Sequence, residues 1–296
     1  MNQKQPCKIC GEPANGYAEV VVRNTYSSRL YSCNNCGFVF IAPVYWLEEA
    51  YAEVITPTDV GCVSRNLASS GFLCSVLCET AKRSDFFVDF GGGYGLLVRL
   101  MRDRGFRFHL HEPNAENLFA RNCEADLVRF GPYRALTAIE VFEHLSDPAL
   151  SVAEMLRWSQ CLVFTTELCP VSRPMPEEWW YLGLEHGQHI SFYTKKALNL
   201  LAVQHGLKYC YLGDGWHIVA TSNDPMLGKT KTNERSLILR LASRFSNRLQ
   251  PRDVRPSLVE HDFNAIKRII RTGAGASANS AGHVDDPQNG GCVPKG

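Results

Sequence analysis

Four cysteines near the N-terminus have the spacing of metal ligands. Cys7 and Cys10 form one Cys-x-x-Cys pair, and Cys33 and Cys36 form a second. Two residues between thiolates allow one tight turn to present both sulfurs to the same ion, and the glycine after each pair lets backbone amides fold back toward those sulfurs. Two such turns complete a tetrahedral site. We therefore predict a structural Zn²⁺ with four cysteine ligands and no coordination position left open for catalysis.

A glycine-rich segment is the second motif that could carry chemistry. A short apolar run around Asp89 predicts a buried strand, and Gly91, Gly93 and Gly95 follow it directly. Glycines let the backbone turn sharply and approach a ligand closely, and a helix that starts after them points its N-terminus at the site. A dinucleotide-binding fingerprint would need a small residue where Leu96 stands, so the segment disfavours an NAD site.

Around the glycine segment, predicted strands and helices alternate with short connections. This order predicts a doubly wound α/β sheet that is covered on both faces. The predicted strands are 86–90, 106–111, 136–142, 161–166, 207–212 and 217–221, the last two antiparallel, and the predicted helices are 45–52, 67–81, 96–104, 114–122, 148–159 and 194–205.

The glycine segment reads Asp89-x-Gly91-x-Gly93-x-Gly95. It resembles the first motif of class I methyltransferases, (E/D)-x-G-x-G-x-G, and this resemblance implies S-adenosylmethionine as the cofactor. The glycines would lie against its methionine and ribose portions, while Asp89 would anchor the loop or reach the amino group through water. The family places an acid at the end of the second strand to hold the ribose hydroxyls, and Glu112 stands at that position.

Further segments extend the resemblance to zinc-ribbon class I methyltransferases that are often associated with cell-surface sugar synthesis. Glu140, Glu143 and His144 fit the family's fourth-strand pattern, E-x-x-E-H-L. Residues 162–167 resemble its fifth-strand block, and residues 185–193 resemble the segment that enters the active site before the last crossover helix. The resemblance implies that Glu140 binds the cofactor and that Glu143 and His144 belong to the catalytic side.

The resemblance also implies a Rossmann-like sheet of seven strands in the order 3-2-1-4-5-7-6, with the seventh strand antiparallel. Between Asn122 and Leu136, however, the chain has little room for the third strand and its helix. In the family, an acid after that strand often holds the adenine amino group. Asp126 is the candidate for this role in the segment.

Histidines are the candidate general bases, because their side chain titrates in the range that proton abstraction needs. His189 is the first choice, since Gln188-His189-x-Ser191 resembles the Glu-His-x-Ser segment of sugar C-methyltransferases. In those enzymes the glutamate partners the histidine, whereas here Gln188 replaces it. His144 is the second choice, and each histidine also fits a purely structural role at a strand end.

Composition limits the classes of partner. The chain has 296 residues and a net charge of +1, which gives no basic field for nucleic acid. Its start lacks the apolar run of a signal peptide, and no stretch reaches the roughly 18 to 20 apolar residues of a membrane span. Close cysteine pairs in such a chain favour metal binding and reduced thiols over disulfides. We therefore expect a cytoplasmic protein, and its oligomeric state stays open.

The sequence divides into five segments. The predicted boundaries are a zinc ribbon over 1–40, a helical bridge over 41–84, an S-adenosylmethionine-binding methyltransferase domain over 85–222, a C-terminal helical extension over 223–271, and a disordered tail over 272–296. Within the extension, residues 233–249 predict a basic amphipathic helix.

These observations predict methyl transfer from S-adenosylmethionine to a small-molecule or saccharide-type acceptor. The alternative is a methyltransferase-like scaffold without activity, which the short region after Asn122 favours. A nucleic-acid methyltransferase is disfavoured by the near-neutral charge and by the lack of an (N/D)-P-P-(Y/F) motif.

Overall fold

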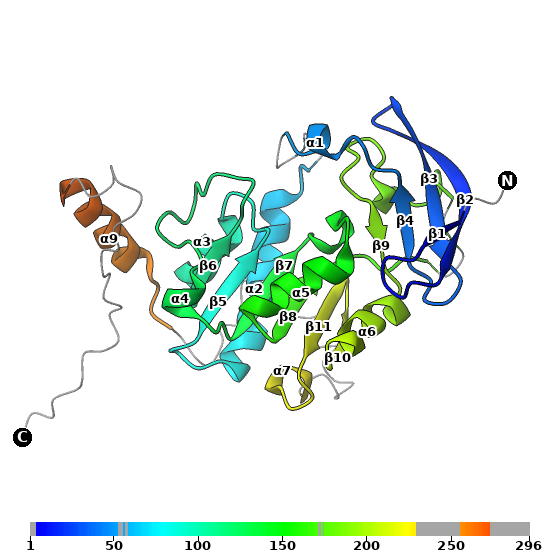
Figure 1. Ribbon diagram of the computed structural model, residues 1–296. Helices are drawn as coiled ribbons and strands as arrows, with labels where there is room; N and C mark the ends of the chain where they lie inside the picture. The colour runs from blue at the N-terminus through cyan, green and yellow to red at the C-terminus, as the bar shows by residue number, and fades with distance from the viewer. Residues whose placement is uncertain are drawn as a thin grey trace, which may run out of the picture.

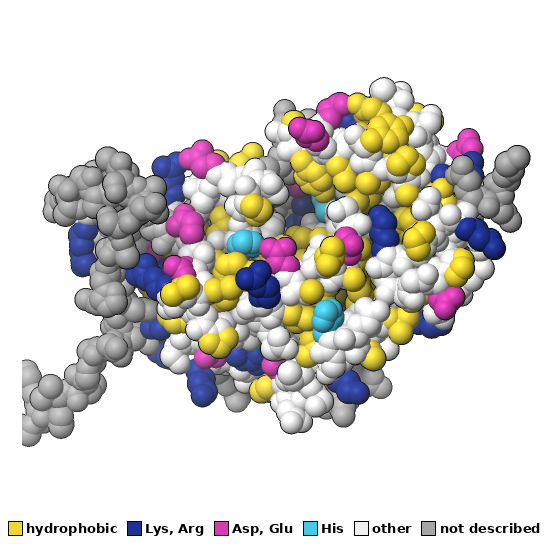
Figure 2. Space-filling model, in the orientation of Figure 1, with side chains coloured by type: hydrophobic (Ala, Val, Ile, Leu, Met, Phe, Trp, Pro, Cys, Tyr) yellow, Lys and Arg dark blue, Asp and Glu magenta, His cyan; other side chains and the backbone are white. Residues whose placement is uncertain are grey.

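The computed structural model describes residues 4–52, 56, 59–170, 173, 175–228 and 255–272. The predicted helix over 233–249 and nearly all of the predicted tail lie outside these ranges. Within the described residues, no helix combines the length and apolar character that a membrane span requires. On the face in Figure 2, acidic and basic side chains are interspersed among hydrophobic ones, in keeping with the near-neutral charge.

The N-terminal part forms an antiparallel sheet. Four of its strands are consecutive and the fifth comes from much later in the chain, as Figure 1 shows at its right side. The strands, in spatial order, are β1 (Lys4–Pro6), β2 (Pro13–Val22), β3 (Tyr26–Cys33), β4 (Val39–Ala42) and β9 (Ser191–Phe192). The pairing of β9 with β4 joins this sheet to the segment around His189.

The central sheet is mixed. Strands β8, β7, β5 and β6 run parallel to one another. At the edge formed by β8, strand β11 pairs with β8 in the antiparallel direction, and β10 pairs with β11 in the same way. The spatial order is β10 (Lys208–Gly213), β11 (Trp216–Ala220), β8 (Cys161–Thr165), β7 (Ala135–Ile139), β5 (Phe86–Phe90) and β6 (Arg107–His111).

Helices cover both faces of the central sheet, because its strands are apolar on both sides. On β5, Val88 packs into one core and Phe87 into the other. The core with Val88 also receives α5 (Pro148–Trp158) and α6 (Lys195–Gln204), which lie in front of the sheet in Figure 1. The other core receives α2 (Cys62–Thr80), α3 (Leu96–Asp103) and α7 (Pro225–Gly228). The doubly wound prediction is confirmed.

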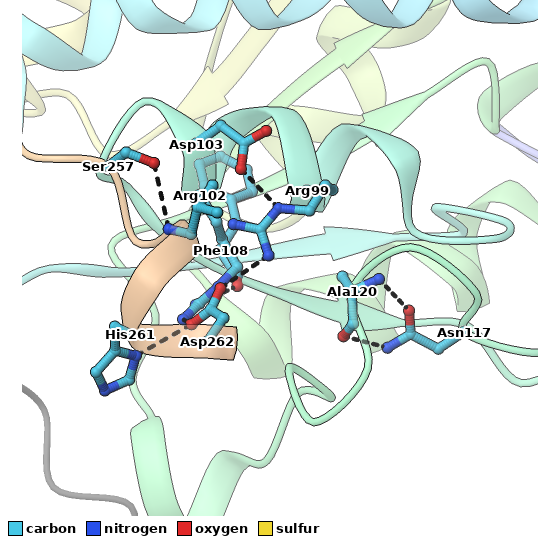
Figure 3. A network of polar contacts seen from close by, with 10 residues as sticks. Arg99, Arg102, Asp103, Phe108, Asn117, Ala120, Ser257, His261 and Asp262 are labelled. Carbon is cyan, nitrogen blue, oxygen red and sulfur yellow. Dashed lines mark hydrogen bonds and ion pairs between the residues drawn. The ribbon is translucent and has the colours of Figure 1, made fainter. Parts of the chain in front are cut away.

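One predicted helix is wrong. Residues 114–122 form turns, because the side chain of Asn117 binds the backbone that a helix would need. Its Oδ1 accepts a hydrogen bond from the Ala120 amide at 2.9 Å, and its Nδ2 donates to the Ala120 carbonyl (Figure 3). Asparagine favours such local bonds over helix. The predicted helix over 45–52 is also shorter, as α1 (Leu47–Ala50).

The described part of the central sheet has six strands, not the seven that were predicted. Where the third strand was expected, the chain makes a single parallel bridge between Leu110 and Glu124. The segment then turns into the short α4 (Leu127–Phe130), with Asp126 as its N-cap, accepting bonds from the amides of Val128 and Arg129. This short path to β7 leaves no length for a full strand.

The C-terminal helix α9 (Val259–Thr272) is attached to α3 by a buried ion pair (Figure 3). Both oxygens of Asp262 accept bonds from Arg102, each at 2.8 Å, and Arg99 donates a third at 2.9 Å. Burial alone would raise the pKa of Asp262, but the bonds and charge of Arg102 outweigh it and leave that pKa below its usual range.

Asp262→Asn is expected to lower the free energy of unfolding by about 3 kcal/mol, because Arg102 would stay buried without its counter-charge. The pKa of Asp262 is lower in the folded than in the unfolded protein, so its contribution is present above about pH 4 and lost as the pH falls below that value. Urea denaturation at neutral and acidic pH measures both effects. Asp103→Asn, which breaks a more exposed pair with Arg99, should cost less than about 1 kcal/mol. Equal losses in the two variants would contradict this account.

Candidate active site and four-cysteine metal site

The candidate active site lies where the four parallel strands end. Because parallel strands share a direction, the segments that follow β5, β6, β7 and β8 meet at one edge of the sheet. The glycine loop follows β5, Glu112 follows β6, Glu140 follows β7, and Thr166 follows β8. The fold therefore brings predicted residues from three different strands to a single edge.

The glycine loop adopts backbone angles that side chains rarely allow. Gly91, Gly93 and Gly95 have φ values of 69°, 54° and 83°. A Cβ on Gly95 would lie 2.7 Å from the Oδ1 of Asn117, and one on Gly92 would lie 2.3 Å from the Oδ2 of Asp89. The loop thus needs glycine both for its turns and for close packing, which leaves bare backbone at the edge of the sheet.

Asp89 lies beneath this loop and is buried. Its Oδ1 accepts a hydrogen bond from the hydroxyl of Thr137 at 2.6 Å. Burial raises the pKa of Asp89 to about 7, opposed by the Thr137 hydroxyl and assisted by the charge of Glu112. Of the two roles expected for Asp89, its position beneath Gly92 fits anchoring of the loop.

Glu112 lies across the glycine loop. Its Oε2 accepts a hydrogen bond from the Gly93 amide at 3.1 Å, and its Oε1 accepts one from the Asn114 amide at 2.8 Å. A carboxylate has about four acceptor positions, so both oxygens keep capacity for further donors such as ribose hydroxyls. The half-buried side chain therefore contacts the backbone of the glycine loop at the edge of the sheet.

Glu140 takes a strained position at the end of β7. Its φ is 55°, which is uncommon for a residue with a side chain and is often found at functional sites. Two hydrogen bonds with the Thr165 hydroxyl hold it: the Glu140 amide donates at 2.9 Å, and the hydroxyl donates to Oε1 at 2.7 Å. These bonds fix the carboxylate on the same edge as the glycine loop.

The segment that carries His189 is attached to the short 3-10 helix η1 (Phe142–His144), which follows β7. The Ile190 amide donates to the Glu143 carbonyl at 2.8 Å, and the Ser191 hydroxyl donates to the Leu145 carbonyl at 2.6 Å. The Tyr193 hydroxyl donates to the Phe142 carbonyl at 2.8 Å. These bonds bring His189 beside η1, although many residues separate them in sequence.

The result is a cluster of Glu143, His144 and His189, called the Glu–His–His cluster below. One donor atom from each of the three lies within 4.8 Å of the others, and the two imidazole centroids are 5.1 Å apart. The Nδ1 of His189 lies 2.6 Å from the Tyr181 carbonyl, so this nitrogen must carry the proton, and Nε2 is left as the acceptor. The Nδ1 of His144 lies 2.8 Å from the Tyr51 hydroxyl.

Burial dominates the electrostatics of the cluster. Glu143 is fully buried, and neither of its carboxylate oxygens has a hydrogen bond of acceptable geometry within the described residues. Burial and the charge of Glu140 raise the pKa of Glu143 to about 8, while nearby hydroxyls of Tyr181 and Thr166 act in the opposite direction. Burial lowers the pKa of His189 to about 4 and lowers that of His144 as well. Both imidazoles are therefore neutral at physiological pH.

Sequence patterns did not indicate that two tyrosines would hold the cluster. Tyr51 comes from just after α1, and Tyr181 comes from the 3-10 helix η2 (Trp180–Leu182); neither had a motif. Gln188, expected beside His189, instead donates its side-chain amide to the Ala50 carbonyl at 2.8 Å. Gln188 thus ties α1 to the site.

The four N-terminal cysteines also converge. Their sulfurs all lie within 4.8 Å of one another, with Cys7 and Cys36 at 3.5 Å, Cys10 and Cys33 at 3.5 Å, and Cys10 and Cys36 at 3.7 Å. These separations are too long for disulfides. They approach the roughly 3.8 Å expected between sulfurs of a tetrahedral site with Zn–S bonds of about 2.3 Å. The donor set and geometry fit a zinc ion.

A sheet of this order with a glycine loop after its first parallel strand is the class I methyltransferase fold. In agreement, residues 71–212 match the family model described as a methyltransferase domain. This match covers slightly less than half of the chain. The predicted fold class is confirmed. The comparison with curated proteins gives no match.

Several solved structures are similar to this chain at low identity. The mitomycin 7-O-methyltransferase is 21% identical with a TM-score of 0.34, and the match covers 51% of this chain and 53% of that one. An O-methyltransferase family protein from Burkholderia thailandensis is 10% identical with a TM-score of 0.40, covering 61% and 64%. The plantazolicin methyltransferase is 12% identical with a TM-score of 0.40, covering 67% and 84%. This chain thus spans only about half the length of the mitomycin enzyme.

Proposed function

We propose that this protein transfers a methyl group from S-adenosylmethionine to a hydroxyl of a small-molecule or saccharide-type acceptor. The observation that carries the proposal is the meeting of the glycine loop, Glu112 and the Glu–His–His cluster at one edge of the sheet. The first two supply a place for a nucleoside, and the cluster supplies groups that can handle a proton beside it.

The residues of this edge fit the cofactor. The bare backbone of Gly91, Gly93 and Gly95 allows close approach, and the oxygens of Glu112 can accept hydrogen bonds from two ribose hydroxyls. Glu140 stands between this loop and the cluster and is the further candidate for a cofactor contact. When bound, S-adenosylmethionine supplies an activated methyl group, so the protein has to align the acceptor and remove its proton.

His189 is the candidate for proton removal. The bond of its Nδ1 to the Tyr181 carbonyl fixes the tautomer in which Nε2 is an open acceptor, as a general base requires. Glu143 and His144 lie beside His189 in the same cluster and are the candidates for orienting the acceptor hydroxyl.

An exposed aromatic side chain favours a ring-shaped acceptor. Trp180 is 79% exposed, and its ring centroid lies 5.4 Å from that of Tyr181, whose ring in turn lies 4.7 Å from His189. A flat aromatic ring can stack on a sugar. Trp180 is therefore placed to meet an acceptor as it enters.

We also propose that Cys7, Cys10, Cys33 and Cys36 hold a structural Zn²⁺. Its role would be to stabilise the N-terminal sheet. That sheet contains β9, which pairs with β4 and directly follows the segment that carries His189. Four thiolate ligands would leave the ion no open position for chemistry.

Glu112→Ala is expected to weaken binding of S-adenosylhomocysteine, the demethylated cofactor, at least tenfold, because the ribose loses its acceptors. The matched control is Glu116→Ala, which removes a nearby exposed carboxylate paired with Arg121. Isothermal titration calorimetry measures both. Unchanged affinity in Glu112→Ala would remove this residue from the cofactor site, and absence of binding by the wild-type protein would favour a scaffold without activity.

A further inference from the structure

Glu143 is an unusual carboxylate even for an active site. Its side chain is fully buried, and neither oxygen has a hydrogen bond of acceptable geometry within the described residues, although the hydroxyls of Tyr181 and Thr166 lie near enough to act on its pKa. A buried carboxylate costs several kcal/mol unless it is neutralised, hydrogen-bonded or bound to a cation. Glu140, the neighbour with the largest charge effect on it, is also acidic and adds to the cost. A bound cation would therefore remove the cost of burying this side chain as a carboxylate.

The two histidines beside Glu143 are oriented as metal ligands usually are. A metal-binding imidazole nearly always uses its second nitrogen to contact a carbonyl, a carboxylate or another polar group. His189 contacts the Tyr181 carbonyl through Nδ1, and His144 contacts the Tyr51 hydroxyl through Nδ1. In both rings Nε2 is the remaining nitrogen, and one nitrogen of each ring lies within 4.8 Å of a carboxylate oxygen of Glu143.

We propose that Glu143, His144 and His189 bind one divalent transition-metal ion, separate from the zinc of the four cysteines. Two imidazoles with one carboxylate are a donor set for Zn²⁺, Mn²⁺, Fe²⁺ or Co²⁺, whereas Mg²⁺ prefers oxygen ligands alone. Ligands of one ion lie about 3 to 3.5 Å apart when each bond is about 2.1 Å. Because the three donor atoms already lie within 4.8 Å of one another, binding needs movements of about 1 Å.

The ion would change how the acceptor is activated, and this part rests on the proposed function. Three protein ligands leave open positions, so an acceptor hydroxyl can bind the ion directly. The ion lowers the pKa of that hydroxyl, and its proton passes to solvent. The oxygen then forms a bond to the methyl carbon while the carbon–sulfur bond breaks, and its electron pair stays on sulfur. In this form His189 acts as a ligand and not as the base.

Metal binding by the full-length protein tests the proposal without any acceptor or cofactor. Protein prepared without added metal is titrated with Co²⁺ and, separately, with Mn²⁺ and Mg²⁺, followed by elemental analysis after desalting. Cobalt bound by four thiolates absorbs strongly, whereas cobalt bound by nitrogen and oxygen absorbs weakly, so the two sites are counted apart. We expect two Co²⁺ per chain, one of each kind, and no retained Mg²⁺.

Variants identify the second site. His189→Ala and His144→Gln should each weaken binding of the weakly absorbing Co²⁺ at least tenfold. Binding of the thiolate-bound Co²⁺ should be unchanged. His205→Gln, an exposed histidine at the end of α6, is the matched control and should retain both ions. Circular dichroism establishes that each variant is folded. A single thiolate-bound ion in the wild-type protein, or a second ion that both histidine variants keep, would overturn the proposal. Cofactor binding without a second ion would overturn the metal site alone and leave the proposed function intact.

Discussion

Replacement of His189 by alanine is expected to lower turnover by a factor of about 100 to 10,000, with cofactor affinity nearly unchanged. Loss of a positioned acid–base group has an effect of this size, and loss of a metal ligand would act in the same direction. Cofactor affinity should be unchanged because the two groups lie at different places. His189 belongs to the Glu–His–His cluster beside η1, whereas Glu112 and the glycine loop follow β6 and β5. Release of S-adenosylhomocysteine, with an acceptor found by screening hydroxylated small molecules and saccharides, measures turnover.

The matched control is again a surface histidine. His205→Ala should keep both turnover and cofactor affinity, since His205 is exposed at the end of α6. A His189→Ala protein with wild-type turnover would exclude His189 from catalysis as a base and as a ligand.

Replacement of Cys33 by serine is expected to release the thiolate-bound zinc and unfold the N-terminal sheet. Structural zinc contributes about 10 kcal/mol or more to small domains that it stabilises, which exceeds the stability of most domains. Elemental analysis measures the metal, and thermal unfolding followed by circular dichroism measures the sheet. Cys210→Ser, at a half-buried cysteine in the central sheet, is the control and should retain the zinc.

The loss should also reach the candidate active site. The Thr194 hydroxyl donates to the Cys36 carbonyl at 2.6 Å, and the Ile41 amide donates to the Ile190 carbonyl at 3.0 Å. These bonds hold the segment from His189 to Thr194 against the N-terminal sheet and its four cysteines. Turnover should therefore fall when the zinc is lost. A Cys33→Ser protein that keeps its zinc and its thermal stability would contradict the predicted metal site.

Local sequence patterns were sufficient for most of the central sheet. The apolar run before the glycine loop became β5 as predicted, and Thr194 caps α6 where the pattern placed a helix start. Strong periodicity and turn residues report local structure, which is why these elements could be predicted. The four-cysteine cluster was predicted for the same reason, since each Cys-x-x-Cys turn is local.

The helix predicted over 114–122 failed because its periodicity does not report side-chain bonds to the backbone. Asn117 takes the amide and carbonyl of Ala120, and Asn122 adopts a φ of 62°. Asparagine and proline around residues 113–117 are turn residues, and giving them more weight would have found the turn.

The parts that could not be predicted depend on contacts between distant residues. The strand β9 has two residues, too few for any periodicity, and it forms only because β4 offers it an edge. Tyr51 reaches His144, and Asp262 reaches Arg102, through contacts that no sequence motif records. The surroundings of the Glu–His–His cluster were therefore visible only in the folded protein.

The central claim is that the glycine loop and Glu112 bind an S-adenosyl nucleoside. Calorimetric titration of the wild-type protein with S-adenosylhomocysteine, and with NAD in parallel, tests it most directly. We expect a one-to-one complex with a dissociation constant of about 1 µM or tighter for S-adenosylhomocysteine, equivalent to roughly −8 kcal/mol, and no binding of NAD. No binding of S-adenosylhomocysteine at millimolar concentration, or preferential binding of NAD, would contradict the account.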